Sequence, residues 1–393
     1  MESVDMEYQE MKETVLKAIA RNHDELFRVN VEIADNPEIA GKEKTSSKRL
    51  VDLLHAHGFR CEYPYGNYDY TFKAIFGENN HSRKIAVLAE FDALPGLGHA
   101  CGHSLSGVIS CLAAIALSSL QNELDADVHV IGTPGEELYS TKGYMGQDGL
   151  VDEYDMAIMV HLYNSNLPSP NVLALSCFNY EFFGKPAHSG AVPWEGVNAL
   201  NAAQLQFHAI DMARQHIKDG SRIHGIYLDG GTAVNIVPEH AESRIYVRAK
   251  TREYRDELVA WVDKMAEGAA LATNCTWKKH TKTFPTDDLK VNRTGDMVLR
   301  DVFAELGYEI GDESVIFASS DVGCVSYICP TFQPCLKIVD PPVNIHTAEF
   351  ETLMRTPAAE KALDDGAALI AFHILRIFTD PALFSSMQED FRR

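Results

Sequence analysis

The sequence is poor in basic residues for its size and contains no long uninterrupted apolar run. Lys and Arg number 35 against 56 Asp and Glu, which gives the 393-residue chain a formal net charge of -21. Phosphate binding requires a basic surface, so this balance argues against a nucleic-acid partner. The apolar stretches are too short to cross a bilayer, and the acidic N-terminus lacks the pattern of a secretory signal. We therefore expect a cytoplasmic protein that binds neither nucleic acid nor membrane.

The chain also lacks a cysteine framework. Its 8 cysteines are scattered through a large sequence, so a network of disulfides is not expected. Hydrophobic residues make up 46% and charged residues 23%, which is typical of a globular enzyme. Length alone indicates two to three domains.

Apolar strands alternate with helices in the first part of the chain. Residues 84–89, 127–132 and 156–161 are predicted to be buried strands, and an apolar helix is expected at about 104–120. Continuous apolar strands separated by helices are typical of a mostly parallel sheet covered on both faces. The fold class is therefore α/β.

The pattern changes near residue 176. Strands are expected at 177–183, 223–228, 242–250 and 275–283, with helices at 196–216 and 252–272. This β-α-β-β-α-β order is typical of a ferredoxin-like module. After about residue 285 the first pattern resumes, so the module is inserted. We predict a first part at 1–175, the inserted domain at 176–287 and a second part at 288–393.

Residue types that bind metals follow several predicted strands. Asp92, the pair Glu136 and Glu137, and His161 each lie at such a strand end. In an open α/β sheet the carboxyl ends of the strands face the ligand crevice. Taken singly, a histidine is more often structural and a glutamate pair is usually solvated. Together, carboxylate, thiolate and imidazole groups at this edge fit a transition-metal site.

Six short motifs give the chain a family resemblance. Between about residues 90 and 350 it resembles the aminoacylase/carboxypeptidase superfamily of co-catalytic metallohydrolases with a zinc-peptidase-like fold. It is most similar to the amidohydrolase branch that includes auxin-conjugate hydrolases, aminobenzoyl-glutamate hydrolase and β-alanyl-lysine dipeptidase. The motifs are Asp92-Ala93-Leu94-Pro95, His99-Ala100-Cys101-Gly102-His103, Pro134-Gly135-Glu136-Glu137, Gly184-Lys185-Pro186-Ala187-His188-Ser189-Gly190, Asn235-Ile236-Val237-Pro238 and Ser319-Ser320-Asp321-Val322-Gly323.

The resemblance implies a site for two divalent metal ions. Cys101 matches the ligand that bridges both ions in this branch, and the remaining ligands match His103, Glu137, His161 and His346. Two cations roughly 3.5–4 Å apart need shared anionic ligands to limit their repulsion. Sulfur beside imidazole favours zinc, with manganese, cobalt and nickel as alternatives.

Two further acidic residues receive roles from the resemblance. Glu136 matches the general base that takes a proton from the attacking water and delivers it to the leaving amine. Asp92 matches the acid that orients a metal-binding histidine. The sequence departs from the wider superfamily at Glu90, where that superfamily has a metal-binding histidine, and from the branch at Ser104, where Asp or Asn is common. We assign Glu90 no role at this stage.

The inserted domain supplies three more candidates. By resemblance it serves as a lid and as the dimerisation surface of a homodimer. His188 matches a histidine that reaches the neighbouring subunit's active site and helps stabilise the developing oxyanion. Asn235 and Arg248 match residues that contact the substrate carboxylate or amide. From the sequence pattern alone, Arg248 would be assigned to a solvated sheet face and Asn235 to a turn.

The leading functional hypothesis is metal-dependent hydrolysis of an amide bond in a small substrate, a dipeptide or an N-acyl amino acid. One alternative is a non-catalytic ligand-binding protein that retains the fold. Another is a cysteine hydrolase with Cys101 as nucleophile and His103 as base, although two residues of spacing rarely align such a pair. Chelation discriminates the metallohydrolase from the thiol enzyme, because it abolishes the activity of the first and leaves that of the second. Turnover of a panel of dipeptides and acyl amino acids discriminates an enzyme from a binding protein.

Overall fold

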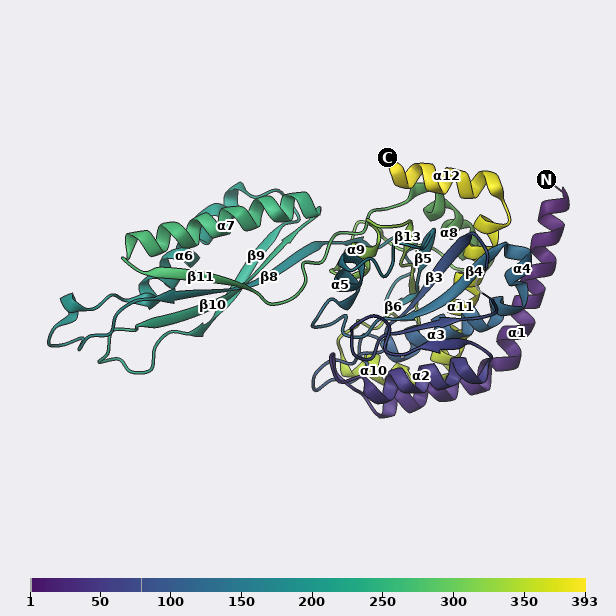
Figure 1. Ribbon diagram of the computed structural model, residues 1–393, viewed down its shortest axis with the longest axis horizontal. Coiled ribbons are helices and arrows are strands. Elements are labelled where there is room, and N and C mark those ends of the chain that lie inside the picture. Colours follow the sequence, from purple (N-terminus) through teal and green to yellow (C-terminus); the bar gives the residue numbers. More distant parts are fainter. Residues whose placement is uncertain (1, 79) are drawn as a thin grey trace. The chain divides into compact units, whose positions relative to one another are not determined.

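The computed structural model describes residues 2–78 and 80–393, which form two compact units that we treat separately (Figure 1). The larger unit comprises Met1–Asn171, Leu289–Phe317 and Asp321–Arg393. The smaller unit comprises Val172–Asp288 and Ala318–Ser320. The sequence places the insertion at 176–287; the structure groups the short segment 318–320 with it.

A six-stranded sheet in the order β1-β2-β4-β3-β5-β13 forms the centre of the larger unit. β3, β4, β5 and β13 run parallel, whereas β1 and β2 form an antiparallel edge. Two-stranded sheets pair β6 with β14 and β7 with β12. This confirms the prediction of a mostly parallel sheet. The strands are β1 Arg60–Glu62, β2 Phe72–Ile75, β3 Arg83–Ala89, β4 Ala126–Gly132, β5 Met156–Ile158, β6 His161–Tyr163, β7 Asn171–Val172, β12 Ile316–Ala318, β13 Thr331–Phe332 and β14 Cys335–Lys337.

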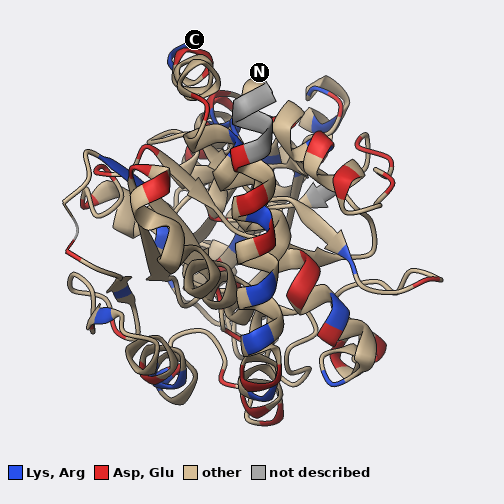
Figure 2. Ribbon diagram, turned by 90° about the vertical axis from the view of Figure 1, so that its right-hand side faces the viewer, with Lys and Arg blue, Asp and Glu red and all other residues tan. Residues whose placement is uncertain are grey.

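Helices pack against this sheet and against one another. The long N-terminal helix α1 carries acidic and basic residues interspersed along its exposed side (Figure 2). Asn292 and Thr347 cap helices with side-chain oxygens that accept backbone N–H groups, as N-cap residues commonly do. The helices are α1 Glu2–Asp35, α2 Lys44–Ala56, α3 His103–Leu117, α4 Gln121–Leu124, α5 Thr141–Gln147, α8 Arg293–Glu305, α9 Val322–Val325, α10 Ala348–Leu353, α11 Pro357–Phe378 and α12 Pro381–Arg392.

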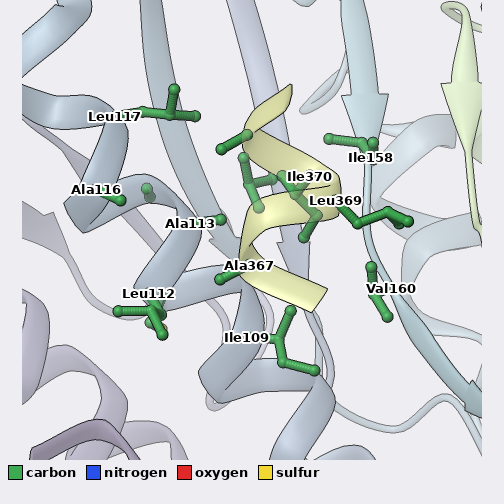
Figure 3. Close-up of a cluster of buried hydrophobic side chains, with 14 of the residues drawn as sticks. Ile109, Leu112, Ala113, Ala116, Leu117, Ile158, Val160, Ala367, Leu369 and Ile370 are labelled. Atoms are coloured by element: carbon green, nitrogen blue, oxygen red, sulfur yellow. The ribbon is translucent and has the colours of Figure 1, made fainter. Parts of the chain in front are cut away.

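Helix α3 lies at the middle of the core, and every one of its residues is buried. Figure 3 shows its Ile109, Leu112 and Ala113 next to Ala367 and Leu369 of α11. The segment His103–Leu124 is long and apolar enough to span a membrane by length and composition, but 89% of its apolar window is buried inside the protein. Core burial accounts for this apolar character, and it also fixes the position of His103 at the first turn of α3.

The smaller unit is a four-stranded antiparallel sheet covered by two helices. Its strand order is β11-β8-β10-β9, and the chain follows the predicted β-α-β-β-α-β path. Burial alternates strictly along β10, which confirms that Ile245 and Val247 face the core while Arg248 faces the other side. The elements are β8 Ala174–Phe183, α6 Ala199–Ala213, β9 Arg222–Asp229, β10 His240–Ala249, α7 Arg252–Ala272 and β11 Thr276–Thr281.

Candidate metal centre

Two adjacent parallel strands deliver acidic residues to one edge of the large sheet. β3 pairs with β4 up to the pair Ala89 and Gly132, where both strands end. Asp92 follows β3, and Glu136 and Glu137 follow β4. The carboxyl ends of neighbouring parallel strands lie together, so these three side chains meet at the edge where α/β proteins bind ligands.

The five predicted metal ligands converge at this edge. The ligand atoms of Cys101, His103 and His161 lie within 4.8 Å of one another, and so do those of Cys101, Glu137 and His346. Cys101 belongs to both groups, which is the arrangement that a bridging ligand requires. A third group joins Glu136 and Glu137 to His103. The described residues therefore bring together two overlapping candidate sites.

Hydrogen bonds aim the two buried imidazoles into these sites. Nδ1 of His103 lies 3.0 Å from Oδ1 of Asp92, and Nδ1 of His161 lies 2.7 Å from the carbonyl oxygen of Leu162. Both contacts suit an Nδ1–H donor, which leaves Nε2 as the ligand atom. Nε2 of His161 lies 3.5 Å from Sγ of Cys101.

The unsatisfied atoms at this edge fit a metal ion. Nε2 of His103 and Oε1 of Glu137 are buried and have no hydrogen-bond partner among the described residues. Buried polar atoms are nearly always paired, so two such atoms at one site indicate a place for a cation. Thiolate, imidazole and carboxylate ligands are those that zinc and similar metals prefer.

Without a cation, the surrounding protein groups favour the neutral forms of two of these side chains. Burial raises the pKa of the Cys101 thiol well above its ordinary value, and His103 opposes this shift. Burial, followed by the charges of Glu137 and Glu90, raises the pKa of Glu136 well above its ordinary value. Two divalent charges would lower both pKa values and favour the thiolate and the carboxylate.

His346 reaches the cluster from a strained loop. Its backbone adopts a positive φ of 61°, which is uncommon for a residue with a side chain. Its N–H group donates a hydrogen bond to the carbonyl oxygen of Ala100 at 2.8 Å, next to Cys101. Its side chain is exposed, with Nε2 3.9 Å from Oε1 of Glu137. The backbone bond therefore holds an exposed imidazole beside the buried ligands.

A buried ion network lies behind the ligands, and the sequence did not predict it. Lys142 is 1% exposed, and its Nζ lies 2.6 Å from both Oε1 of Glu90 and Oδ1 of Asp321. Oε2 of Glu90 lies 3.3 Å from Nε2 of His103. Glu90 and Asp321 lie beside or within the family motifs, but nothing in the spacing of Lys142 marks it as their partner.

Ser104, the second departure from the branch, is buried at the start of α3. Its N–H group donates to Nδ1 of His99 at 3.1 Å. Its hydroxyl oxygen has no hydrogen-bond partner among the described residues. The hydroxyl therefore takes no part in orienting the ligands.

The smaller unit holds the three remaining predicted site residues. His188 and Asn235 are exposed and neighbouring, because the segment around His188 bridges to Ile236 and the N–H of Ser189 donates to the carbonyl oxygen of Asn235 at 2.9 Å. Arg248 is half-buried, and its Nη1 donates to Oγ of Ser319 at 2.9 Å. Arg248 is therefore not a simple solvated residue.

The sequence is similar to those of known peptidases and hydrolases. Residues 175–274 match the model of the M20 peptidase dimerisation domain. The chain is 31% identical to a mouse Xaa-Arg dipeptidase over 79% of this chain and 73% of that protein. It is 27% identical to one of the p-aminobenzoyl-glutamate hydrolase proteins of Escherichia coli over 97% of this chain and 95% of that protein.

Solved structures show the same fold. A Bacillus subtilis protein described as a dinuclear metal binding peptidase of the M20 family superposes with a TM-score of 0.70 at 17% identity, covering 91% of this chain and 99% of that chain. An aminobenzoyl-glutamate utilization protein from Klebsiella pneumoniae superposes with a TM-score of 0.68 at 16% identity. The match covers 89% of this chain and 97% of that chain. The matched dimerisation domain and the extended likeness to the mouse dipeptidase show that this chain belongs to the M20 peptidase family.

Proposed function

We propose that the protein hydrolyses the amide bond of a dipeptide or an N-acyl amino acid with the help of two divalent metal ions. The observation that carries this proposal is the convergence of Cys101, His103, Glu137, His161 and His346 on two overlapping sites with Glu136 beside them. The named relatives, a dipeptidase and a hydrolase of an acylated glutamate, support this substrate range.

The five ligands would hold the ions, which would polarise the scissile carbonyl and make water more acidic. Glu136 takes a proton from the attacking water and passes it to the leaving nitrogen. Asp92 keeps His103 oriented and accepts the N–H of Glu137 at 3.0 Å, so one carboxylate positions two ligands.

We assign to Asn235 and Arg248 the binding of substrate. We assign to His188 a catalytic role, the stabilisation of the developing oxyanion in the active site of the partner subunit of a homodimer. The match to a dimerisation domain supports this assignment. Mixing His188→Ala and Glu136→Gln subunits tests it. Random exchange should restore about a quarter of wild-type turnover, because half of the dimers are mixed and each mixed dimer has one complete site. Mixtures without activity would contradict action between subunits.

Metal loading and substrate screening test the main proposal. Chelated protein should be reloaded separately with zinc, manganese, cobalt and nickel, and each form offered dipeptides and N-acyl amino acids with products identified by mass. We expect turnover that chelation abolishes and one metal restores. Turnover that survives chelation would support the cysteine hydrolase, and the absence of turnover by metal-loaded protein would support a binding protein.

We also propose that the protein is cytoplasmic. All eight cysteines are free, which supports a reducing, cytoplasmic location.

A further inference from the structure

A single buried ammonium group joins three distant parts of the chain behind the metal ligands. Glu90 follows β3, Lys142 is in the first turn of α5, and Asp321 precedes α9. All three side chains are at least 99% buried. The backbone N–H of Lys142 also donates to Oδ2 of Asp321 at 3.0 Å. Asp321 therefore binds both the backbone and the side-chain ammonium group of Lys142.

Glu90 uses its two oxygens differently. Oε1 lies 2.6 Å from Nζ of Lys142. Oε2 has no hydrogen-bond partner among the described residues and lies 3.3 Å from Nε2 of His103, the nitrogen that faces the metal site. Two ligand atoms on one tetrahedral zinc ion are about 3.3–3.5 Å apart, given bond lengths near 2.0–2.2 Å. Glu90 is therefore close enough to become a ligand.

Coordination by Glu90 would occupy a position that the reaction needs. A catalytic metal site keeps one position open for water or substrate. A buried carboxylate without a counter-charge pairs with the nearest cation, because an isolated charge in the interior is costly. In the metal-loaded protein the nearest cations to Glu90 are Lys142 and the ion that His103 would hold. Lys142 therefore competes with the metal for Glu90.

We propose that Lys142 is a positioning residue that holds Glu90 beside the metal centre and prevents it from becoming a ligand. Asp321 holds Lys142 in this place. The inference rests on the proposed metal site, and it assigns Glu90, which occupies the position of a histidine ligand in the wider superfamily, to a non-coordinating role.

The test uses cobalt-loaded protein, because the visible absorption of Co²⁺ becomes weaker as its coordination number rises. In Lys142→Met, Glu90 should bind the ion. We expect a weaker cobalt spectrum, a metal affinity at least equal to wild type, and a kcat about 10- to 100-fold lower with a smaller change in KM. Adding Glu90→Gln to Lys142→Met should restore the cobalt spectrum and much of kcat.

Asp321→Asn is the matched control. The amide oxygen can still accept a hydrogen bond from Lys142, and the pair between Lys142 and Glu90 is left intact. Because Lys142 still engages Glu90, this variant should keep the wild-type cobalt spectrum. Lys142→Met leaves two unpaired carboxylates, those of Glu90 and Asp321, and this variant could fail to fold. The double variant Lys142→Met/Asp321→Asn then replaces it, because only the carboxylate of Glu90 stays unpaired. Its cobalt spectrum and kcat are compared with those of the triple variant that adds Glu90→Gln.

The proposal is overturned if Lys142→Met loses kcat with an unchanged cobalt spectrum, or if Glu90→Gln restores neither the spectrum nor kcat. Those results would leave Lys142 with a structural role. They are distinct from failure of the proposed function, in which the wild-type protein would bind no cobalt or would bind it without turnover.

Discussion

The carboxylate of Asp92 contacts the ring of His103 at 3.0 Å through one oxygen and the backbone of Glu137 at 3.0 Å through the other. The first contact restricts a buried imidazole, since Nδ1 is engaged and the ring cannot turn. Burial raises the pKa of Asp92, but His103 and the N–H of Glu137 outweigh it, so the pKa is lowered. Asp92 is therefore ionised when the site forms.

Asp92→Asn should weaken metal binding by about 10- to 100-fold, the usual cost of losing a residue that orients a metal ligand. The amide cannot accept both contacts, because one of its two polar atoms is a donor. Metal affinity should be measured by competition with a chelator. Unchanged affinity would show that the backbone alone holds His103 and Glu137.

Glu136→Gln should keep the metals and lose turnover by at least about 100- to 10,000-fold, because Gln cannot accept the proton of water. Glu137→Gln, its adjacent control, should instead lose metal, because it removes an anionic ligand from a pair of cations. Metal content and turnover are measured on both. The opposite pattern would reverse the two roles, and a fully active Glu136→Gln would refute the mechanism.

Glu43 should make stability depend on pH. It is buried, and neither carboxylate oxygen has a hydrogen-bond partner among the described residues. Burial and the charge of Asp92 raise its pKa to about 7. The folded state thus binds more protons than the unfolded state between about pH 4.5 and 7, and stability falls as the pH rises through this window.

The variant Glu43→Gln removes this penalty. At pH 8 it should be more stable than wild type by up to about 3 kcal/mol, and near pH 4.5 the difference should vanish. Urea unfolding of the metal-free protein at both pH values measures it. An equal difference at the two pH values would show that ionisation of Glu43 is not the cause.

Two helical glycines should respond in opposite directions to alanine. A Cβ on Gly107 in α3 would lie 2.3 Å from the backbone carbonyl oxygen of Glu90, whereas a Cβ on Gly268 in α7 would meet nothing within 4 Å. Gly268→Ala should stabilise its unit by about 1 kcal/mol through helix propensity. Gly107→Ala should destabilise, because backbone cannot move aside as a flexible side chain can.

The signals of the two units can be separated. All three tryptophans, Trp194, Trp261 and Trp277, belong to the smaller unit. Their fluorescence should report Gly268→Ala, and circular dichroism with metal content should report Gly107→Ala. A stabilised Gly107→Ala would mean that α3 can shift away from Glu90.

The sequence predicted the elements whose burial is strongly patterned and missed those whose burial is not. α7 was predicted at its observed bounds, and the alternation along β10 correctly divided its faces. β1 has three residues with no buried position, so no apolar pattern marks it. The strand expected at 156–161 is two short strands, because the chain moves from pairing with β3 to pairing with β14.

The same limit applies to the site. Most of the predicted ligands lie in short motifs, so resemblance to a family is enough to identify them in the sequence. Lys142 and Asp321 are 179 positions apart, and their contact depends on the tertiary fold. A buried lysine in a seven-residue helix has no local signal that separates it from an exposed one. Roles for the site residues remain predictions that the variants above test.

The complete burial of α3 has a consequence for synthesis of the chain. Its partner α11 begins at Pro357, 240 positions after α3 ends at Leu117. At about 5–20 residues per second, the ribosome needs about 10–50 seconds to make the intervening segment. During that interval the nascent chain carries an apolar helix whose later cover does not yet exist. We therefore expect ribosome-associated chaperones to bind the helix that begins with His103, and we expect the metal centre to be completed only after His346 has been synthesised.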